Sequence, residues 1–388
     1  MNTKFKTFHS RTKIYSGRGS ISALGAISKE LGAARCLLVA DPELEQHGMI
    51  ELARASLREA GLHVEMSLRV EPEPYLDNAD DAAAVGRDLQ ADLVIGLGGG
   101  SAMDTAKAAA ALITNKGKAE AYIGLDKVSI PSPPTVMIPT TAGTGAEVTF
   151  TAVFTNRTTS VKGGINSPYL FPNAALLDPE LTLSVPPLVT AFTGMDALTH
   201  AIESMSGRSS SVFTESLSLT SIRLISASLR QAVYHGNDIE AREKMLLGSL
   251  FGGMALADAG VGAAHALAYP LGGHYRIPHG LANAVLIPHV MQFNLPASVE
   301  ALALVAKSMC ESVEGLSPRW AAQNAVDAVR TLADDIGIPQ SLSDLGIPRA
   351  DIPMLIESAL KVTRPVENNP RKLGPTEAHA IYDAAFAD

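Results

Sequence analysis

The chain has 388 residues and a formal net charge of −9, with 46% hydrophobic and 18% charged residues. These values are ordinary for a folded soluble protein with room for two domains and a sizeable core. The sequence has no basic stripe, which argues against nucleic acid as a partner. Two cysteines are too few for a disulfide framework or a thiolate metal site, and they indicate a reducing compartment.

The N-terminal segment is basic, with no acidic residue before Glu30, and it lacks the apolar core of a signal peptide. A transit peptide remains an open interpretation. However, the alternation around Phe5, Phe8, Ile14 and Tyr15 favours short strands. No apolar run approaches the ~20 residues that a membrane helix needs. We therefore expect a soluble, cytoplasmic protein.

The first half of the chain alternates short apolar runs with helical periodicity. Strand and helix in turn predict βαβ units and a parallel sheet covered on both faces. The predicted strands cover residues 36–41, 63–70, 92–97 and 135–139, and the predicted helices lie near 19–33, 43–60, 77–90 and 101–114.

Helical periodicity dominates after Pro186 and Pro187, a pair that neither continues a strand nor sits inside a helix. The predicted fold class is an α/β N-terminal domain over residues 1–187, followed by an all-α C-terminal domain over residues 188–388. Helices are predicted near 194–206, 213–235, 239–257, 281–294, 298–311, 318–335, 350–361 and 375–386.

A glycine-rich stretch, GLGGGSAMDTAK, follows one predicted strand and opens a helix at residues 96–107. Gly98, Gly99 and Gly100 let the backbone pass close to a ligand. The helix that starts at Ser101 presents free N–H groups to a phosphate, and Ser101 itself is a candidate N-cap. A tight strand-to-helix turn is the plainer interpretation, but the strand–GGGS–helix context favours phosphate binding.

Other candidate cofactor contacts flank this stretch in the sequence. Asp41, at the tip of the strand over 36–41, could bind a ribose hydroxyl and repel a 2′-phosphate, or simply cap a helix. The turn PTTAGTGAEVT at residues 139–149 supplies further hydroxyls and flexible glycines. Its candidate residues are Thr140, Thr141, Thr144 and Thr149, and Lys162 is a candidate for the same site.

The candidate metal ligands fall in two later stretches. Asp196 and His200 are four residues apart, so they project from one face of a helix. The stretch 265–280, HALAYPLGGHYRIPHG, adds His265 and His279, and its prolines and glycines predict an interrupted, irregular segment. One carboxylate and three imidazoles suit iron, zinc, copper or nickel. A surface Asp–His pair is the plainer interpretation of Asp196 and His200 taken alone.

Six motifs, in order and spacing over essentially the whole chain, resemble the iron-containing (group III) alcohol dehydrogenase family. The resemblance implies a dehydroquinate synthase-like fold, with an NAD-binding N-terminal domain, a helical metal-binding domain and a cleft between them. It also implies a homodimer or larger homo-oligomer. The motifs are GGGSAMDTAK, PTTAGTGAEVT, DPELTLSVPP, GMDALTHAIE, HALAYPLGGHYRIPHG and NNPR.

Site residues carry over from this resemblance by position. It implies ferrous iron held by Asp196, His200, His265 and His279, and a pyrophosphate loop at residues 98–101. Further cofactor contacts are implied at Thr140, Thr141 and Thr144, and at Asp104 and Lys162 near the nicotinamide. Asp41 matches the acid associated with a preference for NAD over NADP.

One position departs from the family's pattern. Many members carry a second histidine four residues after His265, which is thought to bind substrate or relay a proton, and this chain has Tyr269 there. The candidates for proton transfer are therefore Tyr269 and His274. Tyrosine at this position also resembles the hydroxyacid–oxoacid transhydrogenase branch. Arg276 could pair with a substrate carboxylate, although a solvated arginine is the commoner case.

The leading hypothesis is a metal-dependent, NAD-linked alcohol dehydrogenase or aldehyde reductase acting on a small molecule. The metal polarises the alcohol oxygen, and hydride moves between the carbinol carbon and the nicotinamide. Alternatives are a hydroxyacid–oxoacid transhydrogenase, a reductase of a carboxylated substrate such as a semialdehyde, and a non-catalytic ligand sensor. Zinc in place of iron also remains open.

Overall fold

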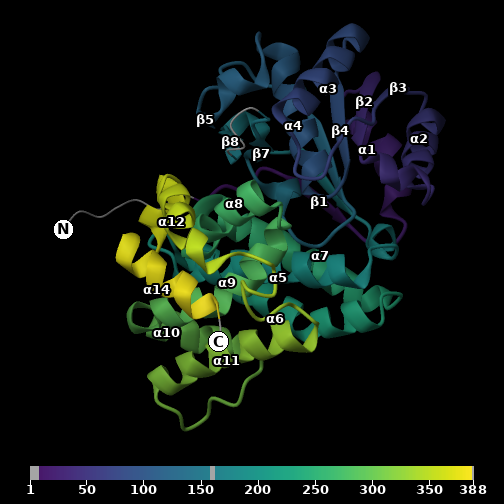
Figure 1. Cartoon of the computed structure of the whole chain (residues 1–388). Coiled ribbons are helices and arrows are strands. Elements are labelled where there is room, and N and C mark those ends of the chain that lie inside the picture. The colour runs from purple at the N-terminus through teal and green to yellow at the C-terminus, as the bar shows by residue number, and fades with distance from the viewer. Residues whose placement is uncertain (1–7, 158–161, 387–388) are drawn as a thin grey trace. The chain divides into compact units, whose positions relative to one another are not determined.

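The computed structural model describes residues 8–157 and 162–386, and the chain divides into two compact units (Figure 1). One unit spans residues 10–185, and the other begins at Pro186 and also includes His9. The first described strand, β1 (Lys13–Ser16), confirms the strand predicted around Ile14 and Tyr15. Phe8, from the same prediction, lies in no strand, so the prediction is wrong there, and Phe5 lies outside the described residues.

The first unit is built on a six-stranded sheet. The alternating pattern predicts its parallel arrangement but not the strand β9. Its strand order is β1-β9-β6-β4-β2-β3, and every neighbouring pair is parallel. The strands after β1 are β2 (Arg35–Ala40), β3 (His63–Ser67), β4 (Leu93–Gly98), β6 (Thr135–Pro139) and β9 (Ala174–Leu177).

Helices cover both faces of this sheet because successive strand residues point to opposite sides. In β2, Cys36 and Leu38 join the core that contains α1 and α2, while Leu37 and Val39 join the core that contains α3 and α4. The helices are α1 (Leu24–Glu30), α2 (Met49–Glu59), α3 (Leu76–Leu89) and α4 (Gly100–Thr114).

The strand order reverses between β2 and β4. From β2 the chain moves outward to β3, then returns to place β4 on the other side of β2. In open α/β sheets, ligands bind outside the carboxyl ends of the strands at such a switch point. Asp41 follows β2 and Gly99 follows β4, so both lie at this place.

A smaller three-stranded sheet with the order β5-β8-β7 completes the first unit. Strands β7 and β8 pair antiparallel, and β5 pairs parallel with β8. Residues 158–161, between β7 and β8, lie outside the described part. The strands are β5 (Gly124–Leu125), β7 (Thr151–Thr155) and β8 (Lys162–Asn166).

The described residues of the second unit form helices joined by loops, with no strand among them. Helices α5, α6 and α7 pack against one another, and α9 packs against α5, α8, α11 and α14 (Figure 1). Its longer helices are α5 (Pro187–Ser206), α6 (Val212–Tyr234), α7 (Ile239–Ala259), α8 (Ala263–Tyr275), α9 (His279–Asn294), α10 (Val299–Ser308), α11 (Pro318–Asp335), α12 (Ile352–Leu360), α13 (Thr363–Asn368) and α14 (Pro375–Ala385).

The prediction of an irregular segment over residues 265–280 is wrong for most of its length. Helix α8 continues through Pro270 and includes Gly272 and Gly273. Its apolar side chains are buried: Leu267 and Leu271 are both 0% exposed. Burial of this face outweighs the hydrogen bond lost at the proline. The helix stops at Arg276, in the left-handed conformation, and Pro278 then precedes α9.

No single helix in residues 8–157 and 162–386 is long and apolar enough to span a membrane. The bent pair of α7 and α8 passes that test of length and composition when its two helices are taken together.

Candidate functional site

The glycine-rich turn joins β4 to α4. Gly98 adopts φ +145°, a conformation that L side chains rarely adopt, and a Cβ there would lie 2.8 Å from the Ala102 Cβ. Gly99 is the N-cap of α4, so Ser101 lies inside the helix and the prediction that it caps the helix is wrong. The first N–H groups of α4 are therefore available to an anion.

The second predicted turn packs directly on the first. The Thr140 N–H donates to the Gly98 carbonyl at 3.0 Å. A Cβ on Gly99 would lie 3.3 Å from Thr141 Oγ1, and one on Gly100 would lie 2.7 Å from Thr144 Cγ2. The structure thus brings together two stretches 40 residues apart, and it explains why the turn needs glycine at these positions.

Asp41 also lies beside the glycine turn, although it precedes the turn in the sequence. Its N–H donates to the Leu97 carbonyl at 3.4 Å, and a Cβ on Gly98 would lie 3.5 Å from the Asp41 Cβ. The Asp41 carboxylate accepts a hydrogen bond from the Glu43 N–H at 3.0 Å, which is the helix-capping role considered for it. The ribose role of Asp41 stays a prediction.

Lys107 contacts both Asp104 and Thr149. We did not predict this lysine from the sequence. Lys107 is 0% exposed, and its Nζ lies 2.9 Å from Asp104 Oδ1 and 3.4 Å from Thr149 Oγ1. It also donates to the Ala146 carbonyl, while Asp104 Oδ2 accepts from the Val153 N–H. Burial raises the pKa of Asp104 despite the Lys107 charge and these hydrogen bonds. The sequence did carry a signal for this pair, because residues three apart, such as Asp104 and Lys107, lie on the same face of a helix and can form an ion pair.

Lys162 lies on β8 and forms an ion pair with Glu73. The predicted roles of Asp104 and Lys162 near a nicotinamide stay predictions, because these contacts join them to residues of their own unit.

Glu147 is a second buried carboxyl, and its side chain is only 1% exposed. We did not predict its role from the sequence. Burial raises its pKa to about 7, against the lowering effects of its own backbone N–H and of Lys107. Folding therefore favours the protonated form. The stability contributed by this carboxyl is fully present below pH 4.5 and is lost as the pH rises through about 7.

We expect Glu147→Gln to remove this pH dependence and to stabilise the chain at pH 8 by roughly 3 kcal/mol. Urea unfolding at pH 5 and pH 8 measures it. Glu357→Gln is the control, since Glu357 is an exposed partner of Lys361 and its replacement should leave the pH dependence unchanged. Equal pH dependence of the native chain and Glu147→Gln between pH 5 and 8 would contradict the assignment.

The helical unit brings the four predicted metal ligands together. Asp196 Oδ1 lies 3.9, 3.8 and 3.9 Å from the Nε2 atoms of His200, His265 and His279. These separations are too long for hydrogen bonds. Ligand atoms on one tetrahedral ion, with bonds of about 2.1 Å, lie roughly 3.4 Å apart. A small inward movement would therefore place Asp196, His265 and His279 on one ion.

His200 fits this group less closely than the other two histidines. The ligand atoms of Asp196, His265 and His279 all lie within 4.8 Å of one another, and His200 is outside that set. Its distance to Asp196 is nevertheless the same as that of His279. The His200 ring also stacks on His265 with centroids 4.7 Å apart, so it borders the three-residue group.

The charges in this cluster are mutually stabilising. Burial by itself would raise the pKa of Asp196, but the three histidines and the hydrogen bond from Asn283 outweigh it and hold that pKa below its ordinary value. Burial by itself would lower the pKa of His265, but Glu203 and Asp196 outweigh it and raise that pKa. One buried carboxylate facing imidazoles suits a divalent ion.

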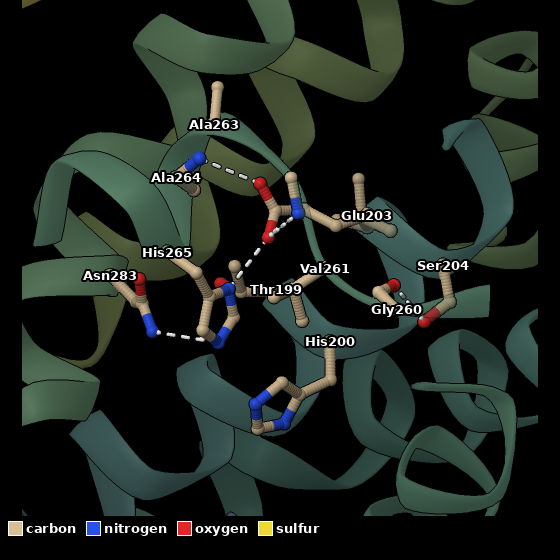
Figure 2. A network of polar contacts seen from close by, with 12 residues as sticks. Thr199, His200, Glu203, Ser204, Gly260, Val261, Ala263, Ala264, His265 and Asn283 are labelled. Carbon is tan, nitrogen blue, oxygen red and sulfur yellow. Dashed lines mark hydrogen bonds and ion pairs between the residues drawn. The ribbon is translucent and has the colours of Figure 1, made fainter. Parts of the chain in front are cut away.

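Two cluster residues were missed in the sequence. Glu203 Oε2 lies 2.6 Å from His265 Nδ1 (Figure 2). The Asn283 amide nitrogen lies 2.7 Å from Asp196 Oδ1 and 3.2 Å from His265 Nε2. A signal existed for Glu203, since it falls seven residues after Asp196, on the same face of α5.

Tyr269 lies beside the candidate ligands, one turn along α8 from His265. Its ring stacks on that of His279 with centroids 5.5 Å apart and an interplanar angle of 9°. Burial, Asp196 and Glu203 raise the pKa of Tyr269 to about 12, although Arg364 lowers it. Its hydroxyl therefore stays protonated at neutral pH and suits hydrogen-bond donation better than proton abstraction.

The other proton-transfer candidate is placed differently. His274 is exposed, and its Nε2 lies 3.3 Å from Ser358 Oγ on α12. The contacts found among the described residues do not join it to the cluster. Arg276 is likewise exposed, at the C-cap of α8. The catalytic role of His274 stays a prediction.

A phosphate-type turn at a sheet switch point and a buried carboxylate–imidazole cluster are the parts that a nicotinamide-linked, metal-dependent dehydrogenase needs. Comparison with known proteins agrees with this class. Residues 11–179 match the family model for iron-containing alcohol dehydrogenase, and residues 190–386 match the C-terminal model of the Fe-containing alcohol dehydrogenase family.

Individual relatives cover nearly the whole chain. The chain is 42% identical over 372 residues to a 1,3-propanediol dehydrogenase of Klebsiella pneumoniae, covering 95% of this chain and 96% of that protein. It is 36% identical to an NAD-dependent methanol dehydrogenase of Bacillus methanolicus, covering 92% and 93%. A solved structure of 1,3-propanediol oxidoreductase matches with a TM-score of 0.96 and 41% identity, covering 99% and 100%.

The chain therefore belongs to the iron-containing alcohol dehydrogenase family. Within it, the chain is an NAD-dependent, metal-binding alcohol dehydrogenase or aldehyde reductase. These relatives do not favour the transhydrogenase alternative.

Proposed function

We propose that the chain interconverts a short primary alcohol or diol and its aldehyde with NAD, using one ferrous ion. Asp196, His200, His265 and His279 would hold that ion. The proposal depends most on one observation: a single carboxylate oxygen lies at nearly equal distances from three imidazole nitrogens. The similarity to a 1,3-propanediol dehydrogenase supports a small diol as substrate.

The residues present fit these groups. When bound, the ion would polarise the alcohol oxygen, and the nicotinamide would accept hydride from the carbinol carbon. The glycine turn and the N-terminus of α4 would bind the pyrophosphate, with Thr140, Thr141, Thr144 and Thr149 around it. Asp41 would accept from the ribose hydroxyls and disfavour a 2′-phosphate. Tyr269 would donate a hydrogen bond toward the substrate.

A substrate panel tests this proposal. The chain is loaded anaerobically with iron or zinc and assayed with short alcohols, diols, hydroxy acids and semialdehydes, using NAD and NADP. We expect the highest kcat/KM with a short alcohol or diol and NAD, at least about tenfold above the same substrate with NADP, because of Asp41. Absence of NAD reduction with every alcohol, or equal rates with a hydroxyacid–oxoacid pair, would contradict it.

Iron rather than zinc, a homodimer or larger assembly, and a cytoplasmic location are further parts of this proposal. They rest on the family resemblance and on the composition of the chain.

A further inference from the structure

Glu203 makes three hydrogen bonds around the start of α8 (Figure 2). Its Oε1 accepts from the Ala264 N–H at 2.7 Å. Its Oε2 accepts from the Gly262 N–H at 2.9 Å and faces His265 Nδ1 at 2.6 Å. Glu203 itself is only 4% exposed, so these contacts replace its hydration.

The Nδ1 contact fixes the orientation of the His265 ring. Both Glu203 oxygens accept from backbone N–H groups, and Oε2 also faces the ring as an acceptor. This contact places a proton on His265 Nδ1 and turns Nε2 toward the cluster, where the Asn283 amide nitrogen lies 3.2 Å away and Asp196 Oδ1 lies 3.8 Å away. A carboxylate that orients a ligating histidine in this way also raises its basicity as a ligand.

The NNPR motif holds the same turn from its other side. Asn368 Nδ2 donates to the Ala259 and Val261 carbonyls, both at 2.9 Å. Asn369, which is 1% exposed, accepts from the Ala263 N–H at 3.3 Å. The turn from α7 into α8 is therefore fixed by Glu203 and by both asparagines.

Glycine is required where these groups meet. A Cβ on Gly262 would lie 3.1 Å from Glu203 Oε1 and 3.2 Å from Asn369 Oδ1. That spacing is tighter than most side-chain contacts allow, so a larger residue would push one of the two acceptors away from the helix N-terminus.

We infer that Glu203 is a positioning residue for the metal ion, which acts through His265. It holds the ring in the Nδ1–H tautomer with Nε2 facing the other candidate ligands. This inference rests on the proposed metal site. The competing explanation is that Glu203 only caps α8. Under that explanation, replacing Glu203 lowers stability but leaves the metal affinity unchanged.

Glu203→Gln separates the two explanations. The variant keeps the shape but turns one oxygen into an NH₂ donor, which must face the Ala264 N–H or the Gly262 and His265 donors. We expect its dissociation constant for Zn²⁺, measured by chelator competition, to rise 10- to 100-fold over the native chain. We also expect the ¹⁵N spectrum of histidine-labelled, metal-free protein to lose the Nδ1–H signal of His265.

Asn368→Ala is the matched control, since it loosens the same turn without touching His265. We expect it to lower Tm as Glu203→Gln does, with a Zn²⁺ dissociation constant within about threefold of native and an unchanged His265 tautomer. If Glu203→Gln keeps the native Zn²⁺ affinity and the native His265 tautomer while its Tm falls, the inference about Glu203 is overturned but the proposed metal site is not. Failure of the native chain to bind Zn²⁺ would overturn the proposed site as well.

Discussion

Asp196→Ala is expected to abolish metal binding and to lower kcat/KM for alcohol oxidation by roughly 1000-fold. Its Oδ1 is the atom that His200, His265 and His279 surround. Without it the four-residue ligand set is reduced to imidazoles, and no negatively charged ligand offsets a buried divalent ion. Metal content after anaerobic iron loading and gel filtration, together with the rate of NADH formation, measures both effects.

Asp335→Ala is the control for this variant. Asp335 pairs with Arg230 at the surface, with about equal exposure of both side chains, so its loss should change neither metal content nor rate. Full activity of Asp196→Ala in a preparation shown to be metal-free would contradict the assignment of the cluster.

Lys107→Met is expected to lower the free energy of unfolding by about 3–5 kcal/mol, because it leaves the other half of a buried ion pair uncompensated. Lys107 is 0% exposed and neutralises Asp104 at 2.9 Å. Its ammonium also donates to the Ala146 and Thr151 carbonyls, which methionine cannot replace. The turn carrying Thr144 and Thr149 would lose its attachment to α4, so weaker NAD binding should accompany the loss. Urea unfolding and NAD titration measure the two effects.

Two further variants show whether the charge itself matters. Lys107→Met combined with Asp104→Asn removes both charges and should recover part of the lost stability. Lys361→Met breaks an exposed pair and should cost less than about 1 kcal/mol. A loss below about 1 kcal/mol in Lys107→Met would show that this network is not structural.

The sequence predicted β2, β3, β4 and β6 and the helices between them, since these strands are short apolar runs and the helices have clear periodicity. It did not predict β9 or the smaller sheet of β5, β7 and β8. The prediction failed at α8, where Pro270 and two glycines indicated a break. Burial of Leu267 and Leu271 at 0% exposure is a tertiary effect that local propensity does not report.

The candidate site was predictable where spacing carries the information. Asp196 and His200 share a helix face by their separation of four, and the glycine turn follows its strand directly. Glu203 and Lys107 are different, because the partners that show their roles lie far away in the sequence: His265 is 62 residues from Glu203, and the partners of Lys107 outside its own helix are 39–44 residues away. The role of a buried charged residue can be recognised only when the fold shows which distant residue it contacts.

Titration of the metal-free chain with Fe²⁺ under anaerobic conditions, with NAD and 1,3-propanediol present, tests the central claim most directly. The claim is that hydride transfer to NAD requires one ion in the Asp196 cluster. We predict that the rate of NADH formation rises linearly with added iron and levels off at about one ion per chain. A metal-free chain that forms NADH as fast as the loaded one would contradict it.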